Sequence, residues 1–361
     1  MTDILIDLAI VLAKILFIVG LTVGFFAPVL TWVERKQSAI MQDRVGANRA
    51  DILGFTVLGL FHIIADAVKM FTKEDFIPEG ANRTLHTLSP IIAVIPAILT
   101  FAVVPFGGVY TIFDREVNLV ISDLDVGLLF VFAIASIATY GYVIAGWSSN
   151  NNWSLLGSMR TASQMISYEV TMGLTIIGVL MVYSTMKLTE IGALQENFFR
   201  WGIFLQPLGF FMFFAASIAE NKRIPFDAPE AESELVAGYF TEYSGLKFGM
   251  FFMAEFIEIV TIGAIMTILF FGAWHIPFLT TATLLSWFEI LGDTGANIVV
   301  MLIHVGVFFA KVCFFIWLQM TVRWTLPRFR YDQIMNLGWK ILLPLSLANI
   351  LVTGIVILAL N

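Results

Sequence analysis

Cysteine is nearly absent from this sequence, since Cys313 is the only one among 361 residues. A single thiol cannot build a disulfide framework, a zinc site or an iron–sulfur cluster. Charge is scarce too: charged residues make up 13% of the chain, whereas a soluble domain carries about 25%. The net charge of −7 argues against a nucleic-acid partner, which needs a basic face. No Gly-x-Gly-x-x-Gly follows a strand-like segment, so no dinucleotide-binding fold is expected.

Apolar residues are abundant instead, at 59% of the chain with a mean hydropathy of +0.88. One soluble core cannot hide so much apolar surface, so we expect a lipid bilayer as the solvent. The first apolar run lacks a basic start and a cleavage site, which indicates a retained span rather than a signal peptide. A spanning helix needs about 20 mostly apolar residues. The prediction is an all-α integral membrane protein, one polytopic domain over 1–361, with eight spans near 4–33, 88–106, 126–147, 161–183, 201–219, 248–274, 296–322 and 338–360.

The distribution of lysine and arginine predicts the orientation of these spans. With eight spans, basic residues gather in the odd-numbered connections, and the even ones hold only Arg115, Lys187 and Arg200. The positive-inside rule then places the odd connections in the cytoplasm and both termini outside. A ninth apolar run at 276–291 is short, and a crossing there would move the basic stretch 323–340 outside. We therefore expect a short surface or re-entrant helix at 276–291. No internal repeat is visible, which disfavours an inverted-repeat transporter.

Two cytoplasmic connections stand out. In the first, 34–86, apolar residues recur at helical spacing over 51–71, which predicts an amphipathic helix. Within it Asp66 can pair with His62 as a proton-handling dyad or with Lys69 as a surface ion pair. The second is the acidic loop 220–247, and the stretch 219–240 reads "AENKRIPFDAPEAESELVAGYF". It is either a folded acidic entrance that leads to buried carboxylates or a solvated loop.

Ionisable residues also lie inside the predicted spans, where each costs about 3 kcal/mol or more. Glu255 and Glu258 are three residues apart and share a helix face. Two carboxylates so close in a low dielectric cannot both be ionised, so one can hold a transferable proton. The set serves either as a proton path or as paired charges that lock helices together. For His304 and Lys311 the favoured role is to lock helices together. Asp7 and Lys14 are close enough to the membrane surface for their charged groups to reach it. For Glu169, Glu255 and Glu258 both the proton path and the locking role stay open.

Six segments carry a resemblance to a known family: "TWVERKQSAIMQDRVGAN", "ADAVKMFTKED", "MISYEVTMGL", "AENKRIPFDAPEAESELVAGYFTEYSG", "FFMAEF" and "LPRFRYDQIMNLGWKILLPLSL". The chain resembles the H-type membrane subunit, called subunit 1 in mitochondria, of proton-pumping NADH:quinone oxidoreductase (respiratory complex I). The segments follow the family order from about 31 to 347 and so cover almost the whole chain. Two departures are Ala47, where the family usually has proline, and Ala228, where it often has leucine. The stretch 274–295 is absent from shorter relatives.

The resemblance implies a subunit that couples quinone reduction to proton translocation and has no redox centre of its own. Quinone is the implied substrate, and FMN and iron–sulfur clusters belong to partner subunits. Implied partners are the peripheral-arm subunits that carry the terminal iron–sulfur cluster, small membrane subunits and antiporter-like subunits, in a bacterial inner membrane rather than a mitochondrial one. The implied quinone chamber comprises Glu34, Arg35, Arg44, Asp66, Phe226 and Asp227. The implied proton path comprises Glu169, Glu220, Glu230, Glu232, Glu234, Glu255 and Glu258.

Other functions remain open from the residues alone. The membrane subunit of an energy-converting hydrogenase or of a non-NADH dehydrogenase would share the embedded glutamates without needing quinone. A stand-alone proton-coupled transporter would act without partners, and a structural anchor would use the charges for assembly only.

Overall fold

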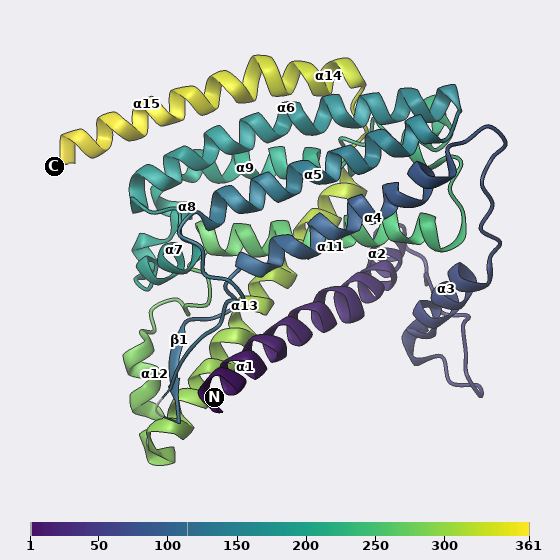
Figure 1. The fold of residues 1–361 in the computed structure, drawn as a ribbon. Coiled ribbons are helices and arrows are strands. Elements are labelled where there is room, and N and C mark those ends of the chain that lie inside the picture. The colour runs from purple at the N-terminus through teal and green to yellow at the C-terminus, as the bar shows by residue number, and fades with distance from the viewer. Residues whose placement is uncertain (1, 114, 361) are drawn as a thin grey trace.

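The computed structural model describes residues 2–113 and 115–360, and for residues 2, 232 and 233 only the backbone. Within these ranges seven helical segments are long and apolar enough to cross a membrane, and they lie alongside one another in an elongated bundle (Figure 1). This confirms an all-α membrane protein. The seven segments are Asp3–Met41, Arg83–Val103, Gly127–Ser148, Asn152–Tyr183, Gly245–Phe270, Glu289–Thr325 and Tyr331–Leu360.

The segments are built from the following elements. At the start of the chain, α1 (Thr2–Val19) continues through a π-helical turn (Gly20–Phe26) into α2 (Ala27–Met41). At its end, α14 (Tyr331–Asn336) continues through a second π-helical turn (Leu337–Leu342) into α15 (Leu343–Leu360). The other long helices are α4 (Arg83–Leu99), α5 (Gly127–Ser148), α6 (Asn152–Tyr183), α11 (Gly245–Phe270) and α13 (Gly292–Thr325). The short helices are α3 (Phe61–Thr72), α7 (Leu188–Leu194), α8 (Gly202–Leu205), α9 (Pro207–Glu220), α10 (Glu232–Leu235) and α12 (Thr281–Trp287). Strands β1 (Val109–Ile112) and β2 (Arg115–Asn118) form an antiparallel hairpin.

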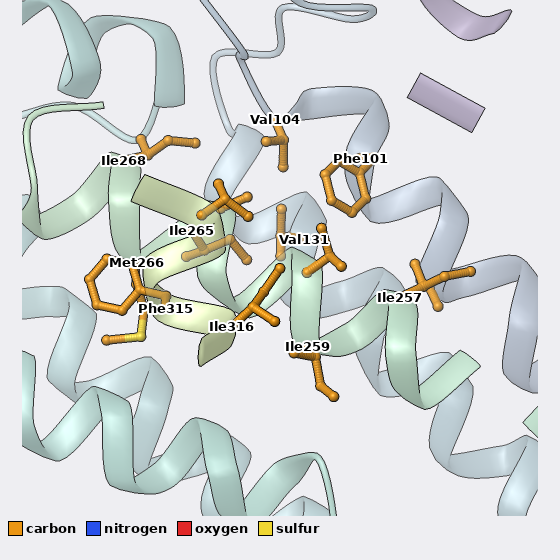
Figure 2. Packing of buried hydrophobic residues seen from close by; sticks show 14 of the residues in the cluster. Phe101, Val104, Val131, Ile257, Ile259, Ile265, Met266, Ile268, Phe315 and Ile316 are labelled. Atoms are coloured by element: carbon orange, nitrogen blue, oxygen red, sulfur yellow. The ribbon is translucent and has the colours of Figure 1, made fainter. Parts of the chain in front are cut away.

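Helix α11 forms the centre of the bundle. In its most apolar stretch 78% of the residues are buried, against 6% in the segment of α1 and α2. It is apolar on nearly every side, as expected of a helix enclosed by others. Ile265, Met266 and Ile268 of α11 pack against Phe315 and Ile316 of α13 (Figure 2). The outer helices α1 and α15 leave most of their apolar side chains exposed, which suits contact with lipid.

The two ends of the bundle differ. Both described termini, the β-hairpin and α12 lie at one end, which we call the terminal end (Figure 1). Helices α3 and α14 and the chain between α9 and α11 lie at the other, which we call the loop end (Figure 1). This polarity positions the functional site, because the charged connections gather at the loop end.

The structure tests three expectations from the sequence. The predicted span 201–219 is divided at Gln206 into α8 and α9, and α9 has only 14 residues. A short helix does lie at 276–291, but α12 has seven residues, rises about 10 Å and cannot cross an apolar core of about 30 Å. The amphipathic helix predicted over 51–71 is wrong before Phe61, where α3 begins. Gly59 breaks it: its φ of 86° is left-handed, and a Cβ there would lie 1.9 Å from the Ala47 carbonyl oxygen.

At the terminal end, Lys311 joins α13 to the chain that follows α11, and His304 joins α13 to strand β1. The Lys311 ammonium donates to the carbonyl oxygens of Phe271, Ala273 and His275, at 2.7, 3.0 and 2.6 Å. These carbonyls follow the end of α11, where a cation suits the helix dipole. His304 Nδ1 lies 2.6 Å from the Tyr110 hydroxyl of β1.

Replacing Lys311 by methionine is expected to destabilise the protein by about 3 kcal/mol, because it leaves three carbonyls without their donor. Thermal unfolding of the purified protein measures this. The matched control is Lys187→Met, whose 3.1 Å pair with Asp123 lies at the surface and whose loss should leave the midpoint unchanged. Equal unfolding midpoints for the two variants would refute the stabilising role of Lys311.

Candidate functional site

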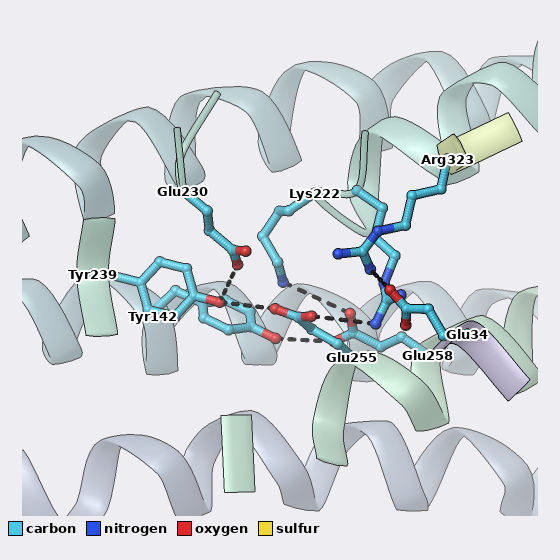
Figure 3. A network of polar contacts seen from close by, with 9 residues as sticks. Glu34, Tyr142, Lys222, Glu230, Tyr239, Glu255, Glu258 and Arg323 are labelled. Carbon is cyan, nitrogen blue, oxygen red and sulfur yellow. Dashed lines mark hydrogen bonds and ion pairs between the residues drawn. The ribbon is translucent and has the colours of Figure 1, made fainter. Parts of the chain in front are cut away.

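Buried charges gather at the loop end, where α2, α11 and α13 meet the chain that follows α9 (Figure 3). We call this set the carboxylate network. It joins acidic and basic groups with two tyrosines, and its members are Glu34, Glu230, Glu255, Glu258, Lys222, Arg223, Arg323, Tyr142 and Tyr239.

Arg223 bridges two of the acids. Its Nη1 lies 2.9 Å from Glu34 Oε2, and its Nη2 lies 3.6 Å from Glu255 Oε2. Arg323 Nη1 holds the other oxygen of Glu34 at 2.6 Å. The Arg223 side chain is only 8% exposed and covers the Phe256 ring with 4.6 Å to its centroid. A planar guanidinium can serve two carboxylates at once, which a lysine does poorly.

Tyr239 connects the next pair of acids. Its hydroxyl lies 2.9 Å from Glu230 Oε1 and 3.2 Å from Glu255 Oε1. A phenol has one hydrogen to donate, so the second contact is a hydrogen bond only if that carboxyl group carries a proton. Burial, and then the neighbouring Glu255, raise the pKa of Glu230 well above its ordinary value. The arrangement can therefore hold a proton that Glu230 and Glu255 share.

Glu258 forms the inner end of the network. It accepts a hydrogen bond from the Tyr142 hydroxyl at 3.3 Å, and Lys222 Nζ lies 3.7 Å away. Beside it is a small cavity of about 60 Å³ whose lining is apolar except for a few groups, among them Glu258, Glu220 and Asn221. Such a space can hold water between carboxylates. Glu169 of α6 accepts a hydrogen bond from Ser136 and lies close enough for its charge to act on Glu220.

A larger cavity of about 540 Å³ opens beside Glu34. Asp66 of α3 lies 2.7 Å from Arg35 in its wall. The lining combines charged groups with the aromatic rings of α11 and α13, as in sites for small organic ligands. Glu34 belongs to both the cavity wall and the carboxylate network. The lining residues include Thr31, Glu34, Arg35, Ser38, Arg44, Asp66, Lys69, Phe248, Phe252, Phe256 and Trp324.

Of the six residues assigned to the chamber, the structure brings Glu34, Arg35, Arg44 and Asp66 to this cavity and places the other two elsewhere. Phe226 packs between Tyr168 and Phe329, with ring centroids 5.7 and 5.5 Å away. Asp227 pairs with Arg328 at 2.6 Å. Burial raises the pKa of Asp227 to about 6 although Arg328 acts against it.

The chain over 221–229 is packed into the protein. Almost every residue in it is buried, and the Gln164 amide donates to the carbonyl oxygens of Ala219 and Phe226, both at 2.7 Å. The solvated loop weighed from the sequence is therefore wrong for this part of 220–247, and the folded acidic entrance stays a prediction. The dyad of His62 and Asp66 stays a prediction: His62 Nε2 accepts from the Ala50 amide at 3.3 Å, and Asp66 pairs with Arg35.

The acids assigned to the proton path lie in different places, some at the carboxylate network and one at the surface. Glu220, Glu230, Glu255 and Glu258 lie in or beside the carboxylate network, and Glu169 lies next to it. Glu234 faces the surface, where it pairs with Arg160 at 2.6 Å. The side chain of Glu232 is outside the described part of the structure.

Six residues of the site were not identified from the sequence: Lys222, Arg223, Arg323, Tyr142, Tyr239 and Gln164. Lys222, Arg223 and Arg323 were counted only as basic residues of cytoplasmic connections. The signal that could have found them was the pair Lys222–Arg223, which follows directly on an apolar helix in an acidic segment.

Comparisons with known proteins identify the family. The family model described as NADH dehydrogenase matches residues 13–354. The chain belongs to this family. It is 48% identical over 356 residues to an H-type subunit of NADH-quinone oxidoreductase from Geobacter metallireducens, covering 98% of each chain. It is 46% identical over 360 residues to an H-type subunit from Geobacter sulfurreducens, covering 99% of each, and 44% identical over 348 residues to one from Cytophaga hutchinsonii, covering 96% of each. The resemblance stated from the sequence is confirmed.

Proposed function

We propose that this chain is the H-type membrane subunit of an NADH–quinone oxidoreductase and that it couples quinone reduction to proton translocation. The observation that carries the proposal is the position of Glu34. This residue lines a cavity of ligand size and, through Arg223, contacts the buried carboxylate Glu255. A change of charge in the cavity therefore has a direct path to groups that can share protons.

In this proposal the 540 Å³ cavity is the part of the quinone chamber that this chain supplies. Phe248, Phe252 and Phe256 offer apolar contacts to the quinone ring and tail. The Arg35–Asp66 pair lies where the polar quinone oxygens need partners. Electrons would come from the FMN and iron–sulfur clusters of peripheral-arm subunits docked at the loop end. Asp227, paired with Arg328, would support the wall indirectly.

The coupling would proceed as a shift of charge along the network. Negative charge that develops in the cavity draws Arg35 and Arg223 toward it and weakens the contact between Arg223 and Glu255. Glu255, left with less positive charge nearby, takes up the proton shared with Glu230 through Tyr239. Glu258, Glu220 and Glu169 extend the path toward the antiporter-like subunits. Such a population shift needs only a few kcal/mol of differential stabilisation.

We further propose eight crossings, with the loop end in the cytoplasm of a bacterial inner membrane. Both described termini lie at one end of the bundle (Figure 1), which supports an even number of crossings. The α8–α9 segment supplies the eighth. Basic residues such as Arg35, Arg44 and Lys69 concentrate at the loop end, as the positive-inside rule demands. The single domain would carry the connections 34–86 and 220–247 on that side.

Replacing Asp66 by asparagine is expected to lower quinone reduction by the assembled enzyme about tenfold, which corresponds to about 1.4 kcal/mol. The substitution removes the carboxylate that orients Arg35 in the cavity wall. NADH:quinone activity reports the effect, and NADH:ferricyanide activity reports assembly of the peripheral arm. Asp75→Asn is the matched control, because Asp75 pairs with Lys247 outside the cavity lining. Full quinone activity in Asp66→Asn would contradict the assignment of the cavity.

A further inference from the structure

Lys222 is the least restrained charge in the carboxylate network. Its side chain is fully buried, with 0% exposure, and among the described atoms its Nζ has no hydrogen-bond partner. The nearest groups are the face of the Tyr142 ring, 3.5 Å to the centroid, and Glu258 Oε2 at 3.7 Å. A cation–π contact attracts an ammonium without fixing its direction. The ammonium is therefore held inside the protein but not locked to one acceptor.

The backbone at Lys222 is strained. Its φ of 55° is left-handed, and the residue follows Asn221, the C-cap of α9, at the position that glycine or asparagine usually occupies. A lysine is strained in this conformation because its Cβ lies too close to the following carbonyl oxygen. Strain of this kind tends to persist where function needs it. Here it directs a long, flexible side chain between the acids rather than toward solvent (Figure 3).

Acids surround Lys222 on several sides. Glu258 of α11 is the one it contacts. Glu220 of α9 and Glu230 of the following loop lie near enough for its charge to act on them. Arg223, its neighbour in sequence, is occupied with Glu34 and Glu255. Lys222 thus lies between the Glu230–Tyr239–Glu255 group and the Glu258–Glu220 group.

We propose that Lys222 is a positioning residue that sets which acid of the network carries charge. Its ammonium keeps Glu258 ionised in the resting enzyme and moves toward Glu220 or Glu230 when Glu258 takes up a proton. The proposal rests on the proposed function, because it assigns a moving counter-charge to that proton path. No bond forms or breaks except those to the transferred proton.

The test uses Lys222→Asn in the assembled complex. Asparagine tolerates a left-handed backbone, so the charge is removed without added strain. Infrared spectra of the resting enzyme should gain the C=O stretching band of one protonated carboxyl group, and Lys222→Asn/Glu258→Gln should lack that band. The proton-to-electron ratio of Lys222→Asn in proteoliposomes should fall about twofold or more. Lys247→Asn, whose lysine pairs with Asp75 at 3.0 Å, should match the unmodified enzyme in both measurements.

The outcomes separate this inference from the function on which it rests. Absence of the new band in Lys222→Asn overturns the inference, and so does a band that survives in the double variant. Normal pumping by Glu258→Gln would instead count against the proton path, while the band in Lys222→Asn would still report the effect of Lys222 on Glu258.

Discussion

Replacing Arg223 by methionine is expected to lower the NADH:quinone activity of the assembled enzyme about a hundredfold or more. Methionine fills a similar volume but leaves Glu34 and Glu255 without the cation that joins them. Breaking a buried ion pair by removing one partner costs about 3–5 kcal/mol. Glu34 keeps Arg323 at 2.6 Å, so the larger loss falls on Glu255 and on communication between cavity and network.

Two further variants sharpen this expectation. Arg160→Met removes an arginine that makes an even shorter contact, 2.6 Å to Glu234, at the surface. Exposed pairs contribute about 0–1 kcal/mol, so this control should keep most of the activity. Arg223→Lys keeps the charge but cannot reach both acids as well, and an intermediate activity is expected. If Arg223→Met were as active as Arg160→Met, in complexes shown to be intact on native gels, the bridging role of Arg223 would be refuted.

Replacing Glu255 by glutamine is expected to lower coupled turnover about tenfold, because the variant loses a group that can take up a proton. Losing such a group lowers the rate about 10²–10⁴-fold where the proton transfer is fully rate-limiting. Glutamine has almost the same shape and can still bond to Tyr239, so a change reports proton chemistry rather than packing. Proton uptake into proteoliposomes, measured together with NADH oxidation, gives both rates.

The matched control is Glu234→Gln, because Glu234 is the surface member of the acids assigned to the path. It should leave both rates unchanged. Unaltered quinone reduction and unaltered proton uptake in Glu255→Gln would remove Glu255 from the path, and the same result in Glu169→Gln would remove its extension through α6.

Local patterns in the sequence predicted part of the site. The spacing of Glu255 and Glu258 placed both on one face of α11, and their position inside an apolar run indicated a buried role. Most of the long helices followed from apolar length alone. These features depend on residues that are close in the chain, where helix geometry fixes the outcome.

The contacts between residues that are far apart in the sequence could not be predicted in the same way. Arg223 meets Glu34 across 189 positions of sequence, and no local pattern specifies that contact. The segment 221–229 was composed like a surface loop, yet packing against Gln164 and Phe329 buried it. Helix α3 followed the apolar periodicity only after Gly59, because a close backbone approach to Ala47 decided the preceding turn.

The central claim is that buried carboxylates exchange protons in response to the redox state of a neighbouring quinone cavity. Redox-induced infrared difference spectra of the assembled complex test it most directly, with Glu230→Gln, Glu255→Gln and Glu258→Gln compared one at a time. The account predicts carboxyl C=O bands that change when quinone is reduced and are lost selectively in these variants. A spectrum without such changes, or one that all three variants leave intact, would contradict it.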